Sequence, residues 1–438
     1  MTTIVRARVA HTPRNPFVDD AALETFSDGA VAFSDGRVLA CGAYRDVRAG
    51  HPEAELLDAR DMVLLPGLID CHVHYPQVRV IGAMGLELLD WLRLRSLPEE
   101  ARLADDAYAA SVADRFVRLL AANGTTTALV FGSHFAGAQE ALFSAADRLG
   151  LRIASGLVVS DRGLLPELHA SASAAFESSR ALIERWHGRG LIRYAVTPRF
   201  SVSCSDELLA ACGEIANSAD GLLVTTHLNE TSAEVALVRE LFPSARDYLE
   251  TYERHGLVGS RSVFAHDVHV TDGELRRLSA AGSTVAHCPS SNAFLGSGFF
   301  GLRRHVDAGV SVALGTDVGA GTGLSMLKEG LTAYHTQVLG PNGIRLCPEH
   351  LLWLATGAGA AALGLADSVG DFTPGKSADF VLVRPPAGST LEAVLEGVDS
   401  VEDVLGAVFT LAREDAIAEV RVAGRVVGGS EASSGMCG

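Results

Sequence analysis

The sequence predicts a (β/α)8 TIM barrel joined to a small β domain, and three observations point to this architecture. Short apolar runs alternate with amphipathic helical stretches through the middle of the chain, whereas both ends carry short β patterns. Strands that alternate with helices form a parallel sheet, and eight such units in about 300 residues predict a closed barrel. The length of 438 residues is more than one core normally supports, which favours a second domain.

The two ends of the chain are predicted to share one small β-sandwich-like domain. Near the N-terminus, residues 30–33 and 37–40 flank Ser34-Asp35-Gly36, and the Asp-Gly pair is a hairpin signal. Residues 378–383 and the alternating stretch 419–427 have the same character. We expect residues 1–65 and 366–438 to form this composite domain and residues 66–365 to form the catalytic barrel.

Eight apolar runs are the predicted barrel strands. The clearest amphipathic helices between them are expected at 105–122 and 205–217, and the helix expected near 298–309 is short. The strands are expected near residues 63–72, 126–131, 153–159, 192–198, 221–227, 262–266, 283–287 and 311–317.

Composition argues against several classes of protein. The net charge of −17, without a basic cluster, disfavours binding to nucleic acid or to anionic membranes. No apolar stretch has the length of a membrane span, and the first 20 residues carry no signal-peptide pattern. The 7 cysteines are scattered and form no CxxC pair, which is typical of reduced thiols. We therefore expect a cytoplasmic protein.

Ionisable residues end the predicted strands, which is where barrel enzymes place their catalytic groups. His72 and His74 close the first strand, and side chains two residues apart on a strand project from the same face. Imidazole nitrogens together with a carboxylate suit zinc or a similar divalent ion. The sequence therefore predicts a metal site, with further candidates at or just beyond later strand ends: Arg199, Phe200, His227, Glu230, His266, His287 and Asp317.

These motifs resemble those of the amidohydrolase superfamily and, more narrowly, of the guanine deaminases. The resemblance covers almost the whole chain and rests on residues 66–77 (PGLIDCHVHYPQ), 90–92, 123–127, 196–204, 286–292 and 314–319. It implies one zinc ion per chain, with iron as the alternative, held by His72, His74, His227 and Asp317. It implies a purine-like small-molecule substrate and suggests a homodimer.

The lysine count bears on the number of metal ions. Binuclear relatives resemble one another in bridging two metals with a carboxylated lysine on a middle strand. The chain has only two lysines, Lys328 beyond the last predicted strand and Lys376 in the small domain. A single metal ion is therefore implied.

The activity that the resemblance implies is hydrolytic deamination of guanine to xanthine and ammonia, a step of purine catabolism, by a metal-activated water. Glu230 would protonate a ring nitrogen, His266 would orient the hydroxide and Asp317 would help to accept a proton. Arg199 offers planar donors to a purine carbonyl. The residues implied to contact substrate are His74, Gln77, Arg199, Phe200, His227, Glu230 and Asp317.

Two alternatives remain open at this point. The sequence departs from the usual guanine deaminase pattern at Asn229, Thr231, Asp267 and 93–98, so the same chemistry on a pterin, 8-oxoguanine or a triazine is the nearest alternative. A non-catalytic, oligomeric amidohydrolase-like scaffold is the alternative of a different class. Competent side chains at every ligand and proton-transfer position argue against the scaffold.

Overall fold

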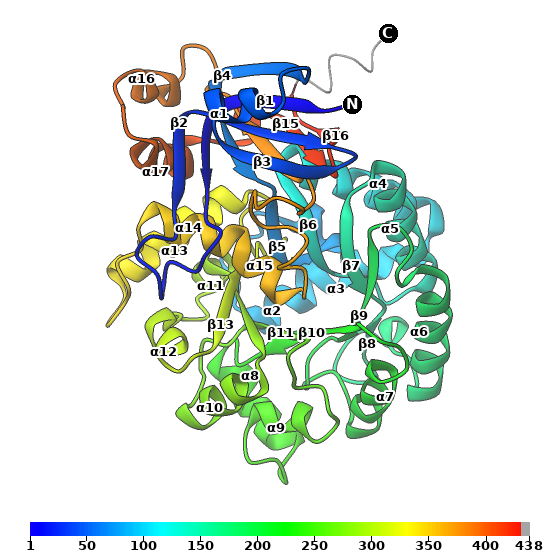
Figure 1. Ribbon diagram of the computed structural model, residues 1–438. Coiled ribbons are helices and arrows are strands. Elements are labelled where there is room, and N and C mark those ends of the chain that lie inside the picture. The colour runs from blue at the N-terminus through cyan, green and yellow to red at the C-terminus, as the bar shows by residue number, and fades with distance from the viewer. Residues whose placement is uncertain (431–438) are drawn as a thin grey trace.

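A computed structural model describes residues 1–430, and in this part of the chain the strands form two sheets (Figure 1). The parallel sheet of the barrel has the order β13-β12-β11-β10-β9-β7-β6-β5, with β8 paired to β9. The other sheet combines segments from both ends of the chain, seen as blue and red strands at the top of Figure 1. The predicted fold class, a barrel with a small β domain built from both termini, is confirmed.

The barrel is nearly closed by contacts between its first and last strands. Beyond the end of β13 the backbone N–H of His74 donates to Val318 O at 3.0 Å, and the N–H of Asp317 donates to His72 O at 2.8 Å. The barrel strands are β5 (Leu68–His74), β6 (Thr125–Phe131), β7 (Arg152–Gly156), β8 (Val158–Val159), β9 (Ile192–Pro198), β10 (Leu223–Leu228), β11 (Ser262–His266), β12 (Thr284–His287) and β13 (Ser311–Leu314).

The helices alternate with these strands and surround the barrel (Figure 1). The bounds of the longer barrel helices are α4 (Asp106–Ala122), α5 (Ala136–Leu149), α6 (Ala172–Trp186), α7 (Asp206–Ala216), α8 (Ser232–Leu241), α10 (Asp272–Ala281), α13 (Met326–Leu339) and α14 (Pro348–Ala355). Shorter helices are α1 (Tyr44–Gly50), α2 (Leu88–Trp91), α3 (Leu97–Ala101), α9 (Tyr248–Glu253), α11 (Pro289–Phe294), α12 (Leu302–Asp307) and α15 (Gly357–Ala362), and α16 (Thr390–Glu396) and α17 (Val401–Leu411) follow β14.

The two clearest predicted helices are present as α4 and α7, and side-chain caps set where they begin. Asp105 accepts a hydrogen bond from the backbone N–H of Tyr108 at 2.8 Å, and Ser205 accepts one from that of Leu208 at 3.1 Å. The short helix expected near 298–309 is α12. No helix among residues 1–430 combines the length and the apolar character needed to cross a bilayer.

The prediction of a single strand over 63–72 is wrong. The apolar run is continuous, but Pro66-Gly67 divides it between β4 (Glu55–Pro66) in the small sheet and β5 in the barrel. A side chain at Gly67 would overlap Thr126 on the neighbouring barrel strand. Glycine therefore permits the close approach that transfers the chain from one sheet to the other. The strand expected over 153–159 is likewise divided into β7 and β8, and that expected over 311–317 ends at Leu314.

The small sheet has the order β16-β15-β14-β4-β1-β2-β3 within the described residues. The predicted hairpin is present, and Asp35 and Gly36 make its turn with φ of 51° and 74°. Its strands are β1 (Thr3–His11), β2 (Glu24–Ser34), β3 (Arg37–Ala43), β4, β14 (Phe380–Val383), β15 (Ile417–Val422) and β16 (Arg425–Gly428). The predicted domain extends to residue 438, but residues 431–438 lie outside the described part of the chain.

Candidate active site

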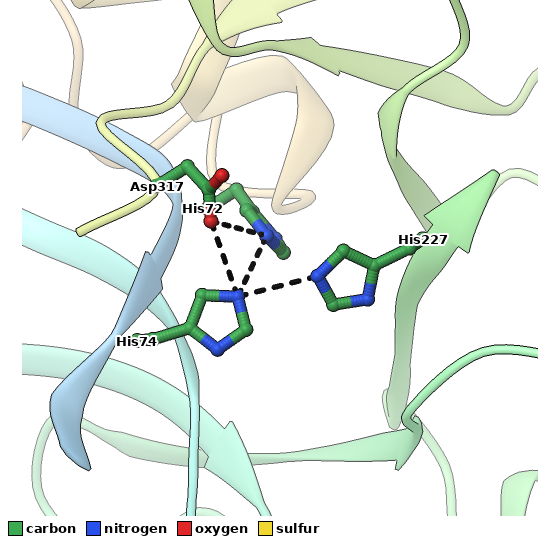
Figure 2. Close-up of side chains that lie close together, drawn as sticks. All are labelled: His72, His74, His227 and Asp317. Carbon is green, nitrogen blue, oxygen red and sulfur yellow. Dashed lines mark hydrogen bonds and ion pairs between the residues drawn. The ribbon is translucent and has the colours of Figure 1, made fainter. Parts of the chain in front are cut away.

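Four side chains that the sequence analysis assigned to a metal meet at the carboxyl ends of the barrel strands (Figure 2). His72 and His74 project from the end of β5, His227 from β10, and Asp317 from the turn after β13. Each offers one ligand atom, and these atoms all lie within 4.8 Å of one another. All four residues are nearly buried, and the most exposed of them, His227, is 8% exposed.

The spacing of these atoms fits a cation better than a set of hydrogen bonds. The Nε2 atom of His74 lies 3.1 Å from Nε2 of His72, 3.2 Å from Nε2 of His227 and 3.2 Å from Oδ1 of Asp317. One imidazole nitrogen has a single proton or a single lone pair, so it cannot satisfy three such neighbours at once. Three nitrogens and one carboxylate oxygen around a common point are a donor set that suits zinc or iron.

The protonation states of the cluster also suit metal binding. Nδ1 of His227 lies 2.6 Å from the carbonyl oxygen of Arg199, so this nitrogen carries the proton and Nε2 is free to bind. Burial lowers the pKa of His72 and His227, and lowers that of His74 to about 4. Burial alone would raise the pKa of Asp317, but the nearby rings of His72 and His74 hold it well below its usual value. The cluster therefore presents neutral imidazoles and an ionised carboxylate.

Glu230 is a buried acid beside this cluster. The turn after β10 positions it: Asn229 adopts a φ of 50°, and the backbone N–H of Glu230 donates to Oε2 of Glu234 at 2.9 Å. Burial, followed by the nearby charges of Glu234 and Asp317, raises the pKa of Glu230 well above its usual value. The raised pKa favours the protonated carboxyl group, which is the form that a proton donor needs.

His266 at the end of β11 faces both acids. Its Nε2 atom lies 3.5 Å from Oε2 of Glu230 and 3.7 Å from Oδ2 of Asp317, and makes no hydrogen bond. Its Nδ1 atom lies 2.9 Å from Oδ1 of Asn292. The amide of Asn292 thus holds the ring with one nitrogen directed between the acids. The sequence analysis missed Asn292, which lies on α11 rather than at a strand end.

The pocket next to the cluster is small and has both apolar and polar walls. Its free volume is about 20 Å³, well below the roughly 300–1,000 Å³ of typical ligand pockets. The lining residues are Leu88, Leu92, Arg199, Phe200, His227 and Glu230, four of which the sequence analysis named as substrate contacts. Leu88 and Leu92 were missed because apolar residues on a helix normally indicate core packing.

Arg199 and Gln77, the two residues predicted to read the ring, meet at one buried carboxylate that the sequence analysis did not identify. Glu100 accepts a hydrogen bond from Nη1 of Arg199 at 2.6 Å and one from Nε2 of Gln77 at 2.8 Å. The Oε1 atom of Gln77 accepts a bond from the N–H of Gly319 at 3.0 Å. The direct contact of Gln77 with substrate therefore stays a prediction, since most of its amide is engaged by the protein.

His287 stands apart from the metal cluster. Its ring stacks on Phe300 with centroids 4.2 Å apart, and neither ring nitrogen has a hydrogen-bond partner. The two lysines also lie outside the cluster, since Nζ of Lys328 donates to Thr322 O at 3.2 Å and Lys376 pairs with Asp371. Neither lysine is placed to bridge two metal ions there.

A barrel whose strand ends carry this cluster is the architecture of a metal-dependent hydrolase, and the comparisons with known proteins agree. The sequence profile of the amidohydrolase family matches residues 63–427. The chain belongs to the amidohydrolase family, whose members depend on metal ions.

Within that family the chain is similar to guanine deaminases. It is 56% identical to "Probable guanine deaminase" of Deinococcus radiodurans over 98% of this chain and 100% of that protein, and 39% identical to "Guanine deaminase" of Escherichia coli over 96% and 95%. The solved structure "E. coli Guanine Deaminase" superposes with a TM-score of 0.94 at 37% identity, covering 98% and 100%. That of the C. acetobutylicum enzyme "with bound guanine in the active site" gives 0.89 at 26% identity, covering 97% and 100%. The chain is therefore a hydrolase related to the guanine deaminases.

Proposed function

We propose that this chain catalyses the hydrolytic deamination of guanine to xanthine and ammonia with one metal ion, zinc or else iron. The observation that carries the proposal is the pocket beside the cluster, which is lined both by the guanidinium donors of Arg199 and by Glu230, an acid whose pKa is raised by burial. The relatives described as guanine deaminases, which match this chain over nearly its full length, support the same substrate.

The metal would be held by His72, His74, His227 and Asp317. Zinc bound to such a site lowers the pKa of water from 15.7 to about 7, which supplies hydroxide near neutral pH. The absence of a lysine from the cluster supports a single ion.

Side chains in and beside the pocket bind the ring and transfer the protons in the remaining steps. Arg199 donates to the carbonyl oxygen of the ring, and Phe200 packs against its face. Glu230 gives its proton to a ring nitrogen as water adds to the carbon that bears the amino group. His266 and Asp317 hydrogen-bond the attacking water and take up its proton. The proton taken from the water passes to the amino nitrogen, which leaves as ammonia when the carbon–nitrogen bond breaks. The hydroxyl group of the adduct returns a proton to Glu230 and becomes the new carbonyl of xanthine.

The direct test is ammonia release by purified, zinc-loaded protein. We expect guanine to be the best substrate in a panel that also contains a pterin, 8-oxoguanine and a triazine. Turnover of another ring without turnover of guanine would reject the substrate but keep the chemistry. Failure of every ring together with a lack of stoichiometric metal would favour the non-catalytic scaffold. A cytoplasmic location and a homodimer stay predictions, which fractionation and light scattering can check.

A further inference from the structure

Glu100, on α3, binds both Arg199 and Gln77, the two side chains that are predicted to recognise the purine ring. The residue is 3% exposed, and its carboxylate meets four polar side chains. Oε2 lies 2.6 Å from Nη1 of Arg199 and 3.4 Å from Nε2 of His134, while Oε1 accepts from Ser96 Oγ at 2.7 Å and from Gln77 Nε2 at 2.8 Å. The predicted reaction assigns Glu100 no role.

The carboxylate is ionised in spite of its burial. Burial alone would raise the pKa of Glu100, but the charge of Arg199 and the nearby imidazole of His134 hold it well below its usual value. A buried charge is tolerated when it is paired and hydrogen-bonded, and both conditions are met here. Arg199 and Glu100 thus form a buried pair of opposite charges at the wall of the pocket.

This pair has two effects on Arg199. The bond to Nη1 fixes the plane of the guanidinium, so that its remaining donors are presented in one orientation. The negative charge of Glu100 also balances the positive charge of Arg199. This part of the pocket therefore offers hydrogen-bond donors without a net charge. Gln77 is fixed in the same way, between Glu100 at one end of its amide and the N–H of Gly319 at the other.

We propose that Glu100 is the positioning and specificity-determining residue of this pocket. It orients Arg199 and Gln77 toward the ring, and it makes the pocket select a neutral, carbonyl-bearing purine over an anionic one. This inference rests on the proposed role of Arg199 as the partner of the substrate carbonyl. Glu100 touches neither the substrate nor the metal ligands in this scheme, so it acts through the two side chains that it holds.

The test compares Glu100→Gln with Glu99→Gln in the zinc-loaded, full-length protein. Glu99 is the matched control because it neighbours Glu100 on α3 but binds Arg102, with Nη1 and Oε2 2.8 Å apart. For Glu100→Gln we expect KM for guanine to rise ~10- to 100-fold, as for loss of a buried charged hydrogen-bond partner. We expect kcat to change little, because uniform binding is lost. Glu99→Gln should match the wild type in both constants.

A second readout separates positioning from damage to the fold. Urate is a purine ring that is anionic at neutral pH, and its affinity is measured by calorimetry without turnover. In Glu100→Gln the uncompensated Arg199 should bind urate ~5-fold more tightly or better, because a like charge has been removed. Guanine and urate are thus expected to respond in opposite directions, whereas a distorted pocket would weaken both.

The proposal is wrong if Glu100→Gln leaves KM for guanine and the affinity for urate unchanged, or if it weakens the binding of both ligands. It is also wrong if Glu99→Gln changes these quantities as much as Glu100→Gln does. If Glu100→Gln does not fold, Ser96→Ala removes one donor to the same carboxylate but keeps its charge, so KM for guanine should rise by a smaller factor and urate should bind no more tightly than to the wild type. Wild-type turnover of guanine is measured first. Failure there rejects the proposed function, and the urate comparison still decides the role of Glu100.

Discussion

The two sides of the active site are built from different parts of the fold. The metal side, His72, His74, His227 and Asp317, stands on barrel strand ends that are joined by backbone hydrogen bonds. The ring side is the part of the pocket that would face the purine ring. Much of it lies on a helical segment between β5 and α4, which consists of α2, the π-helical turn Leu92–Ser96 and α3. This segment contributes Leu88, Leu92 and Glu100. In the proposed function the barrel thus carries the chemistry, whereas the segment between β5 and α4 supplies part of the wall that faces the ring.

The positions at which the sequence analysis expects a departure from the guanine deaminase pattern can be located in the structure. Residues 93–98, one of these positions, fall within the helical segment between β5 and α4. Asn229 and Asp267, two further such positions, contact each other, with Nδ2 and Oδ1 2.9 Å apart. None of these residues is a ligand of the metal side.

The largest expected effect comes from breaking the metal side. Asp317→Ala removes the only carboxylate of the cluster, so we expect loss of bound metal and a fall in kcat of at least ~10⁴-fold, since the metal is what lowers the pKa of water from 15.7 to about 7. Metal analysis and ammonia release check both. The exposed Asp307→Ala is the control, and full metal content in Asp317→Ala would contradict the assignment.

Glu230 lies between the two sides, and its substitution should affect the chemistry alone. We expect Glu230→Gln to lower kcat by ~10²–10⁴-fold, the usual contribution of a general acid or base. Its metal content should equal that of the wild type, because Glu230 is not a ligand of the cluster. Unaltered turnover with metal in place would show that another group moves the proton.

Breaking the ring side should affect binding rather than chemistry. Arg199→Lys keeps the charge but loses the planar fork, so we expect KM for guanine to rise ~10- to 100-fold with kcat nearly unchanged. The KM for 2-aminopurine, which lacks the carbonyl, should change far less. Equal losses with both rings would mean that Arg199 does not read the carbonyl.

The smallest expected effect is on the stability of the fold. It concerns the carboxyl group of Glu329, which lies on neither the metal side nor the ring side. Burial raises the pKa of Glu329 on α13 to about 8 from an ordinary 4.5. The folded protein therefore keeps a proton that the unfolded chain releases, and stability falls as the pH rises from about 4.5 to about 8.

Glu329→Gln should remove this dependence, and we expect it to be more stable than the wild type at pH 9 by up to a few kcal/mol, on the order of the corresponding linkage energy. Denaturant unfolding at pH 5 and pH 9 measures the difference. The exposed Glu396→Gln is the control. Equal pH profiles for wild type and Glu329→Gln would show that the carboxyl is ionised in the folded state.

The metal side was predictable from the sequence because strand ends can be located from apolar runs, and polar residues that end such runs stand out. His72, His74, His227 and Asp317 were found in this way, with the family resemblance assigning their roles. The sequence analysis did not identify Glu100, because a glutamate shortly after a proline at the start of a helix normally faces solvent. Its burial depends on how α3 packs against Arg199, and no local pattern records that packing.

The division of the strand over 63–72 shows a second limit. Apolar residues continue through Pro66-Gly67 without a polar interruption, so the run looks like one strand. Only the partners distinguish its halves: Leu65 pairs with Val381 of β14, whereas Leu68 pairs with Thr125 of β6. Pairing between residues more than 300 positions apart leaves no trace in either segment alone.

The place of β4 also bears on how a nascent chain folds. β4 is flanked by β1 on one edge and by β14 on the other, and β14 begins at Phe380. During synthesis the first four strands leave the ribosome early. The edge of β4 that pairs with β14 therefore has no partner until the whole barrel has been made. We therefore expect the small sheet to be completed last, so that chains arrested before residue 380 expose a strand edge open to aggregation or to chaperones.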